Sequence, residues 1–283
     1  MLNYSVAELR MMKKFFSILS VFALIFAVAS CGDDNKEPQP ETVTRSAQMI
    51  NHIVKSASGE VLPLSESKID YTIDRNNRKV TEVTLRVAID GAAETTVKIT
   101  DIKSETSDQI CTFKGSGNGV QNLVGRFDFN EGTIRVNYDL DGTYRVISTM
   151  PEIFSTECAT SCVYTDGTTS KSDGTMYQFS IDPDSLTSNM TVMYLLDQSK
   201  KRTLTSVKTL TKAKVTVTKE GYVVESETTI PTTTTYKFNG KLTTTTQYPV
   251  SKLKATIDLE NDKYEATMQL GTIAVTANGK VTN

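Results

Sequence analysis

The feature that most constrains the fold is an alternation of apolar and polar residues that runs from about residue 46 to the C-terminus. In residues 133–140 (TIRVNYDL) every second residue is apolar, and the pattern returns in residues 83–89, 253–259 and 264–270. A period of two places alternate side chains on opposite faces of a strand, whereas an amphipathic helix repeats every 3.6 residues. The sequence therefore predicts an all-β fold of antiparallel strands, each with one buried and one wet face.

Turn sequences separate these segments. They are Asp90-Gly91, Asn130-Glu131-Gly132, Asp141-Gly142, Asn239-Gly240 and Asn278-Gly279. Such sequences tolerate positive φ and favour tight hairpins. Residues 46–54 (SAQMINHIV) are the segment that could instead form a short helix.

The turn at Asp141-Gly142 also resembles the start of a calcium-binding loop, with oxygen ligands at Asn137, Asp139 and Asp141. The twelfth position of that loop would be Ser148, which cannot supply the bidentate carboxylate. We expect a type I′ hairpin here and no metal site.

Short repeated sequence segments suggest an internal duplication with a boundary near Pro151. They pair Ile73-Asp74 and Val97-Lys98 with Ile181-Asp182 and Val207-Lys208, and Gly132-Thr133-Ile134 with Gly271-Thr272-Ile273. The second half is longer by a threonine-rich stretch at residues 228–247. We expect two tandem small barrels or sandwiches, at residues 47–151 and 152–283.

The N-terminal part reads as a targeting segment. Residues 12–30 join two lysines to a short apolar stretch that ends in Val28-Ala29-Ser30, directly before Cys31. The stretch is short for a membrane-spanning helix and typical of a signal peptide. The order of residues resembles the lipobox of bacterial lipoproteins, which implies cleavage after Ser30 and lipidation of Cys31.

A polar tether follows at residues 31–46, acidic and proline-containing, with a composition that cannot bury a core. Asp33 and Asp34 resemble the signal that exports lipoproteins of the Bacteroidota to the cell surface. The alternative is a protein that stays in the periplasm. Membrane contact would come from the lipid, since several acyl chains anchor a protein stably.

Three other cysteines remain, Cys111, Cys158 and Cys162. Cys158 and Cys162 could form a disulfide if the chain turns between them, or all three could be thiols. We expect no metal among them, because a CxxC pair is absent and the single histidine, His52, is distant in sequence.

Catalytic motifs are not apparent. No GxSxG elbow surrounds a serine to partner His52, and GSGNG at residues 115–119 lacks the lysine that a phosphate loop requires. A carboxylate pair could lie among the 33 acidic residues, but the sequence does not select one. We expect no enzymatic activity and no cofactor.

Ser185 is a candidate modification site. Asp184-Ser185-Leu186 resembles the short O-glycosylation signal of the Bacteroidota and lies in an expected turn. An Asx-type turn explains the same residues.

The whole pattern resembles the calycin-like, or lipocalin-like, β-barrel lipoproteins of the Bacteroidota. It implies an outer-membrane or cell-surface lipoprotein that binds an unidentified ligand or protein without chemistry of its own. A net charge of −2 argues against nucleic acid as a partner. The alternatives are a fimbrial subunit matured between Arg45 and Ser46, and a carboxylate-dependent hydrolase.

Overall fold

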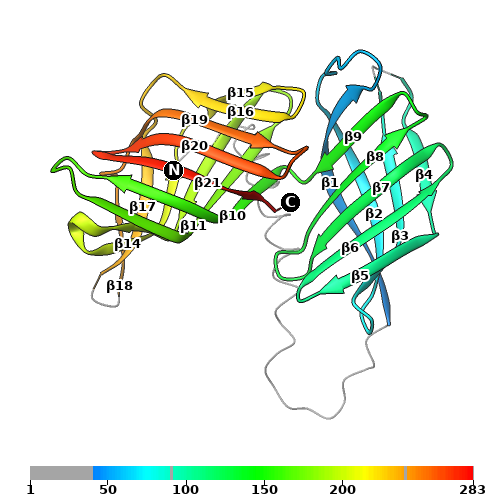
Figure 1. Cartoon of the computed structure of the whole chain (residues 1–283), viewed down its shortest axis with the longest axis horizontal. Coiled ribbons are helices and arrows are strands. Elements are labelled where there is room, and N and C mark those ends of the chain that lie inside the picture. The colour runs from blue at the N-terminus through cyan, green and yellow to red at the C-terminus, as the bar shows by residue number, and fades with distance from the viewer. Residues whose placement is uncertain (1–40, 90–91, 239–240, 283) are drawn as a thin grey trace, which may run out of the picture. The chain divides into compact units, whose positions relative to one another are not determined.

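A computed structural model describes residues 41–89, 92–238 and 241–282, and most of these residues lie in antiparallel strands (Figure 1). The expectation of an all-β fold with two barrel-like sheets is confirmed. Cys31, Asp33 and Asp34 lie outside the described residues, as do the turns expected at Asp90-Gly91 and Asn239-Gly240. No helix in the described ranges has the length and apolar character needed to cross a membrane.

The first sheet, called the first barrel here, has the strand order β4-β3-β2-β1-β9-β8-β7-β6-β5. Its strands are β1 (Thr42–Lys55), β2 (Ser65–Asp74), β3 (Lys79–Val87), β4 (Thr95–Ile99), β5 (Ile102–Ser107), β6 (Ile110–Gly117), β7 (Val120–Asp128), β8 (Thr133–Leu140) and β9 (Tyr144–Thr149). The first strand, β1, pairs with both β2 and the last strand, β9. Strands β4 and β5 stand at the two ends of this order. Side chains of β5 connect it to the β3 side of the sheet, where the hydroxyls of Ser104 and Thr106 donate to the carbonyls of Val80 and Arg78.

The second sheet, called the second barrel, begins after Met150-Pro151. Its elements are β10 (Glu152–Val163), β11 (Thr169–Asp182), β12 (Thr187–Met193), β13 (Leu195–Asp197), the 3₁₀ turn η1 (Gln198–Lys200), β14 (Arg202–Thr209), β15 (Ala213–Val217), β16 (Gly221–Ser226), β17 (Thr232–Phe238), β18 (Lys241–Thr245), β19 (Val250–Asp258), β20 (Lys263–Leu270) and β21 (Ile273–Val281). Strands β10, β11, β12, β15, β16, β19, β20 and β21 form a hydrogen-bonded ring, since β10 pairs with both β11 and the last strand, β21. The threonine-rich stretch supplies β17 and β18, which extend the sheet outside this ring.

One of the two repeated sequence segments occupies corresponding strands in the two barrels. Ile73-Asp74 ends β2 and Ile181-Asp182 ends β11, the second strand of each sheet. Val97-Lys98 lies on β4 and Val207-Lys208 on β14, and each of these strands pairs with the third strand of its sheet. The other repeated segment does not correspond, because Thr133 opens the next-to-last strand of its sheet whereas Ile273 opens the last strand. The duplication and the domain boundary at Pro151 stay predictions.

The structure differs from three local expectations. Residues 46–54 belong to β1 rather than to a helix, because their backbone groups pair with β2 on one side and β9 on the other. That strand begins at Thr42, inside the expected tether. Asn278-Gly279 lies within β21, paired with Glu265 and Tyr264, and the chain reverses instead at Gly271, where φ is +58°.

The hairpin at Asp141-Gly142 is confirmed. Both residues have positive φ, +50° and +63°, as a type I′ turn requires. Asp139 accepts a hydrogen bond from Asn122 Nδ2 at 2.7 Å, so its carboxylate is engaged with the neighbouring strand.

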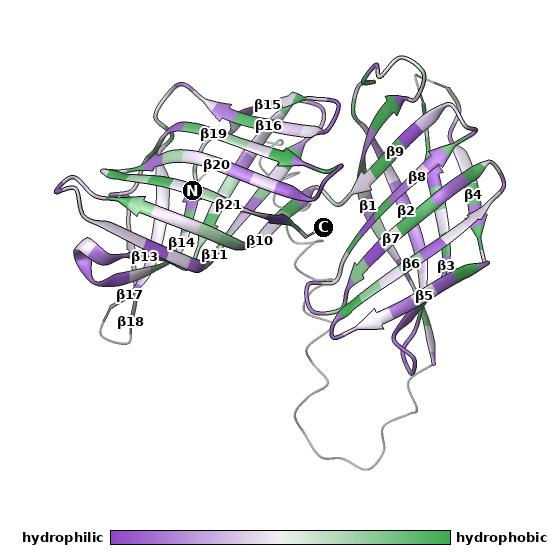
Figure 2. Ribbon diagram, viewed as in Figure 1, coloured by the Kyte–Doolittle hydropathy of each residue, from purple (hydrophilic) through white to green (hydrophobic). Residues whose placement is uncertain are grey.

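Buried apolar side chains form a core in each barrel. Hydropathy alternates along the strands (Figure 2). In the first barrel the ring of Phe113 lies against Gly125, where an added Cβ would come within 2.0 Å of the ring. In the second barrel Tyr264 packs against Tyr177 and Phe179, with ring centroids 5.1 and 5.9 Å apart. Ligand space is therefore better sought outside these cores.

Candidate binding site

Strand β1 is buried on both faces, which marks it as the junction between the two barrels. From Met49 to Val54 every residue is buried. Met49 and Ile53 belong to the core of the first barrel, whereas Ile50 packs into the core of the second barrel together with Ile147 of β9. The outer face of the first barrel therefore completes the core of the second.

His52 forms a hydrogen bond across this junction. Its side chain is 1% exposed, and Nε2 lies 2.6 Å from the carbonyl oxygen of Thr218, in the turn between β15 and β16. Because a carbonyl only accepts, this contact assigns the ring proton to Nε2. Nδ1 is buried and has no hydrogen-bond partner among the described residues. The ring of Tyr222 stands edge-on at a centroid distance of 6.0 Å.

Burial lowers the pKa of His52, and the Thr218 carbonyl and the carboxylates of Glu260 and Glu220 oppose that shift. The imidazole is therefore neutral at pH 7, and the hydrogen bond to Thr218 is that of a neutral donor.

Arg135 of β8 forms a second link. The guanidinium is 8% exposed, donates from Nη1 to Asp262 Oδ1 at 2.6 Å, and donates from Nη2 to the carbonyl of Leu259. Burial lowers the pKa of Arg135 and Asp262 opposes the shift, but an arginine remains charged at neutral pH. The buried charge is compensated by a carboxylate and a carbonyl of the second barrel.

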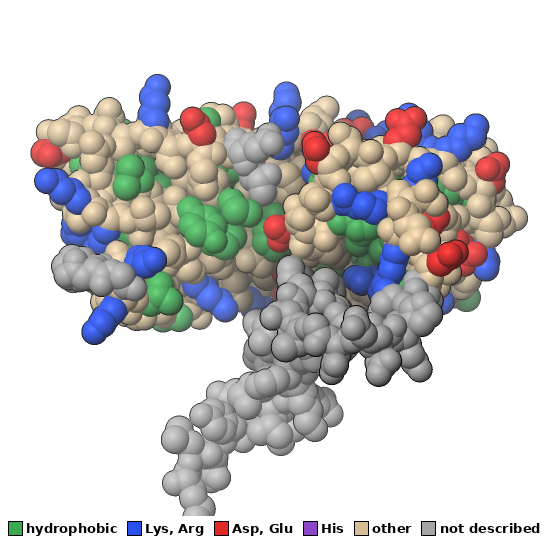
Figure 3. Space-filling view, turned by 90° about the horizontal axis from the view of Figure 1, so that it is seen from below, with side chains coloured by type: hydrophobic (Ala, Val, Ile, Leu, Met, Phe, Trp, Pro, Cys, Tyr) green, Lys and Arg blue, Asp and Glu red, His purple; other side chains and the backbone are tan. Residues whose placement is uncertain are grey.

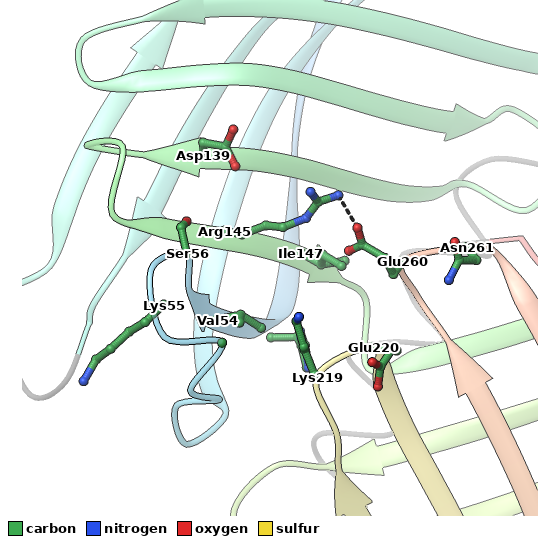
Figure 4. A pocket seen from close by; sticks show the side chains of 12 residues that line it. Val54, Lys55, Ser56, Asp139, Arg145, Ile147, Lys219, Glu220, Glu260 and Asn261 are labelled. Atoms are coloured by element: carbon green, nitrogen blue, oxygen red, sulfur yellow. Dashed lines mark ion pairs between the residues drawn. The ribbon is translucent and has the colours of Figure 1, made fainter.

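A cavity of about 460 Å³ lies beside these links (Figure 4). Its lining residues are His52, Val54, Lys55, Ser56, Gly59, Asp139, Arg145, Ile147, Lys219, Glu220, Glu260 and Asn261. Three are basic and three are acidic, so the cavity carries charges of both signs in balance. Val54 and Ile147 contribute an apolar patch.

Most of the charged groups in the lining already have partners. Arg145 forms an ion pair with Glu260 at 2.8 Å, and Lys55 pairs with Glu60 at 2.9 Å. Lys219 and Glu220 differ, since neither side chain forms an ion pair or a hydrogen bond with any other described residue. These two groups are available to a ligand.

A smaller cavity of about 310 Å³ is lined by residues that include Arg126, Asp128, Phe154 and Met176. The Asp128 carboxylate already accepts hydrogen bonds from the amides of Asn130 and Glu131 in its own turn. This cavity is the weaker candidate.

The cysteine pair lies outside both cavities. Cys158 and Cys162 are buried on β10, four residues apart on a strand that does not turn between them. Four residues of strand span about 13 Å, beyond the roughly 7 Å between Cα atoms that a disulfide bridges. Of the two alternatives, the structure has thiols, and burial raises the pKa of both.

Ser185 lies in the exposed turn between β11 and β12. Its amide donates to Asp182 Oδ1 at 3.1 Å, and its hydroxyl lies 2.6 Å from the hydroxyl of Thr187. The turn is therefore organised by Asp182 rather than Asp184. Glycosylation of Ser185 stays a prediction.

Sequence reasoning missed the cavity, whose residues come from four separate stretches of the chain. One signal was present in residues 49–54 (MINHIV), where apolar residues come in the adjacent pairs Met49-Ile50 and Ile53-Val54, so the alternation expected of a half-buried strand fails.

Comparisons with known proteins add little. No protein-family model matches the sequence, and no curated protein matches it. Among solved structures, the chain aligns with the crystal structure of the isotype 1 transferrin binding protein B from serogroup B Neisseria meningitidis. The alignment covers 86% of this chain and 77% of that one, with 6% sequence identity and a TM-score of 0.24. A likeness of this degree carries no argument about function.

Proposed function

We propose that this protein is a lipid-anchored binding protein of the outer membrane, displayed at the cell surface, that holds a small polar ligand in the cavity beside His52. The observation that carries the proposal is the cavity of about 460 Å³, with Lys219 and Glu220 uncommitted in its lining. Its volume lies within the roughly 300–1,000 Å³ usual for small-molecule sites. The proposal also places the protein among the calycin-like lipoproteins of the Bacteroidota.

The anchor part of the proposal rests on Cys31 and the residues before it, and surface display rests on Asp33 and Asp34. On the face drawn in Figure 3, basic and acidic side chains are interspersed, so no single-sign field attracts a polyanion to that face. Protease added to intact cells should digest the protein. Full protection while the outer membrane is intact would place it in the periplasm.

A binding role suits the cavity better than hydrolysis. A carboxylate-dependent hydrolase needs an acid whose pKa is raised beside an ionised partner. Burial raises the pKa of Glu152, which lines neither cavity. The imidazole of His52 has Nε2 committed to a backbone carbonyl, so it is not oriented toward a serine or cysteine nucleophile.

The fimbrial alternative is also less well supported. Arg45 and Ser46 pair with Tyr71 and Asp70 in the β1–β2 ladder. Cleavage between them would remove only the first residues of β1, and the rest would stay paired with β2 and β9. Such a cut opens no groove for a donated strand.

The binding proposal can be tested by filling the cavity. Ser56 is exposed and lines it, whereas the neighbouring Ala57 is exposed and does not. A panel of amino acids, dipeptides, monosaccharides and dicarboxylates is screened against the detergent-solubilised protein by saturation-transfer NMR. We expect at least one probe to bind the wild type and Ala57→Trp but not Ser56→Trp. Binding by no probe, or binding that survives Ser56→Trp, would contradict the proposal.

A further inference from the structure

We infer that the ligand of this cavity is a zwitterion of amino-acid or dipeptide size, whose carboxylate pairs with Lys219 and whose ammonium group pairs with Glu220. This inference rests on the proposed function and specifies its ligand.

The charges favour such a ligand. Lys219 offers an ammonium group and Glu220 a carboxylate, and neither is neutralised by another described residue. A ligand with one charge would leave the opposite cavity charge unpaired, whereas a zwitterion satisfies both. Charge-assisted hydrogen bonds of this kind are about twice as strong as neutral ones.

The turn that carries both residues is held in place from several sides. The carbonyl of Thr218 accepts from His52, and its amide donates to the carbonyl of Gly221 at 2.8 Å. The carbonyl of Glu220 accepts from the amide of Leu259 at 2.8 Å. At Gly221 φ is +153° and an added Cβ would come within 2.2 Å of the Ile257 carbonyl, so the close approach requires glycine. Groups on a rigid turn lose little entropy when a ligand binds.

Lys219 extends across the cavity toward the first barrel. Its Cε lies 3.7 Å from where a Cβ would stand on Gly59, in the loop after β1. Figure 4 shows Lys219 and Glu220 leaving the same turn, with Val54 and Ile147 on the strands opposite. The end of the Lys219 side chain therefore lies beside the loop after β1, in a cavity that Val54 and Ile147 also line.

The remaining lining selects against sugars. Val54 and Ile147 can contact an aliphatic side chain, and the lining contains no tyrosine, phenylalanine or tryptophan on which a sugar ring could stack. Together the charges and the apolar patch fit a small aliphatic dipeptide.

The test uses Ala-Val as the probe, with N-acetyl-Ala-Val and Ala-Val amide as its singly charged analogues, titrated into the full chain by calorimetry. We expect Ala-Val to bind and each blocked analogue to bind at least about 10-fold more weakly, as the loss of one charge-assisted hydrogen bond implies. Lys219→Met should bind Ala-Val and its amide equally, and Glu220→Gln should bind Ala-Val and its N-acetyl form equally. The control Lys214→Met, at an exposed position of β15 outside the cavity lining, should behave as wild type.

Two results would overturn the inference. One is failure of Ala-Val to bind at millimolar concentration. The other is an affinity that is the same for Ala-Val and both blocked analogues, and the same in the wild type and both variants. If a neutral or singly charged probe then binds and is excluded by Ser56→Trp, the zwitterion inference fails while the proposed function stands. If no probe is excluded by Ser56→Trp, both fail.

Discussion

The Nε2 of His52 donates a hydrogen bond to the carbonyl oxygen of Thr218, 2.6 Å away and 166 residues later in the chain. The bond links β1 of the first barrel to the turn that carries Lys219 and Glu220. Because His52 also lines the cavity, the ring both joins the barrels and shapes that cavity.

Stability should fall with acidification through His52. Burial lowers its pKa in the folded state below 6.5, so folding favours the neutral ring. That contribution is fully present above the unfolded-state pKa and is lost as pH falls from about 6.5 toward the lower folded-state value. Glu260 and Glu220 are the carboxylates that act on the ring, and the other charged residues lining the cavity beside it are Lys55, Asp139, Arg145 and Lys219. The unfolding free energy of the wild type, measured by urea titration, should be lower at pH 5.5 than at pH 7.5.

His52→Gln is the control for that prediction, because its amide can still donate to the Thr218 carbonyl. The difference in unfolding free energy between the two pH values should be smaller in this variant. An equal drop in both proteins would assign the pH dependence to other groups.

Arg135→Ala should cost about 2–3 kcal/mol of unfolding free energy, because it removes charged hydrogen bonds to Asp262 and Leu259 from a buried position. Asp262→Asn should cost less than about 1 kcal/mol, since that side chain is 60% exposed and solvent screens the pair. Guanidinium chloride titrations of both variants measure the difference. Equal costs would mean that the carboxylate, not the buried guanidinium, determines the strength of this link.

Gly125→Ala should destabilise the first barrel by about 1–3 kcal/mol, because the new methyl group would overlap the Phe113 ring in a filled core. Gly174→Ala on β11 is the matched control, since an added Cβ there meets nothing within 4 Å. It should change stability by less than about 0.5 kcal/mol. Thermal unfolding followed by circular dichroism compares the two, and equal melting temperatures would contradict the packing account.

Separating the barrels at Pro151 should leave two halves that keep strand-type circular dichroism but depend on each other. Each half retains its own first-to-last strand pairing, yet Ile50 and Ile147 belong to the core of the second barrel. We expect residues 152–283 alone to be less stable than the intact chain and to associate with residues 41–151 on mixing. Halves that are fully stable and do not associate would show that this shared core contributes little.

Cys31→Ser should release the protein from membranes without unfolding it, because the cysteine precedes the described barrels in sequence. Fractionation in detergent-free buffer, with circular dichroism of the soluble fraction, checks both parts. A variant that still sediments with membranes would rule out the lipid as the principal anchor.

The sequence by itself determined that the alternating segments form strands and which face of each is buried, because a period of two is a local property of extended backbone. The turn at Asp141-Gly142 was predictable for the same reason, since its positive φ values depend on those two residues. The pairing of Asn278-Gly279 inside β21 was not, because neighbouring strand β20 supplies the partners that override a turn sequence.

Only the tertiary structure decided which strands close each barrel and where the cavity lies. Alternation assigns a face to a residue but not a partner, so the pairings of β1 with β9 and of β10 with β21 follow from contacts distant in sequence. The cavity combines β1 and the loop after it, β8, β9 and two turns of the second barrel. Its uncommitted charges, Lys219 and Glu220, lie in a turn whose sequence resembles any exposed loop. Their proximity to His52 arises because the first barrel must bury Ile50 and Ile147 against the second.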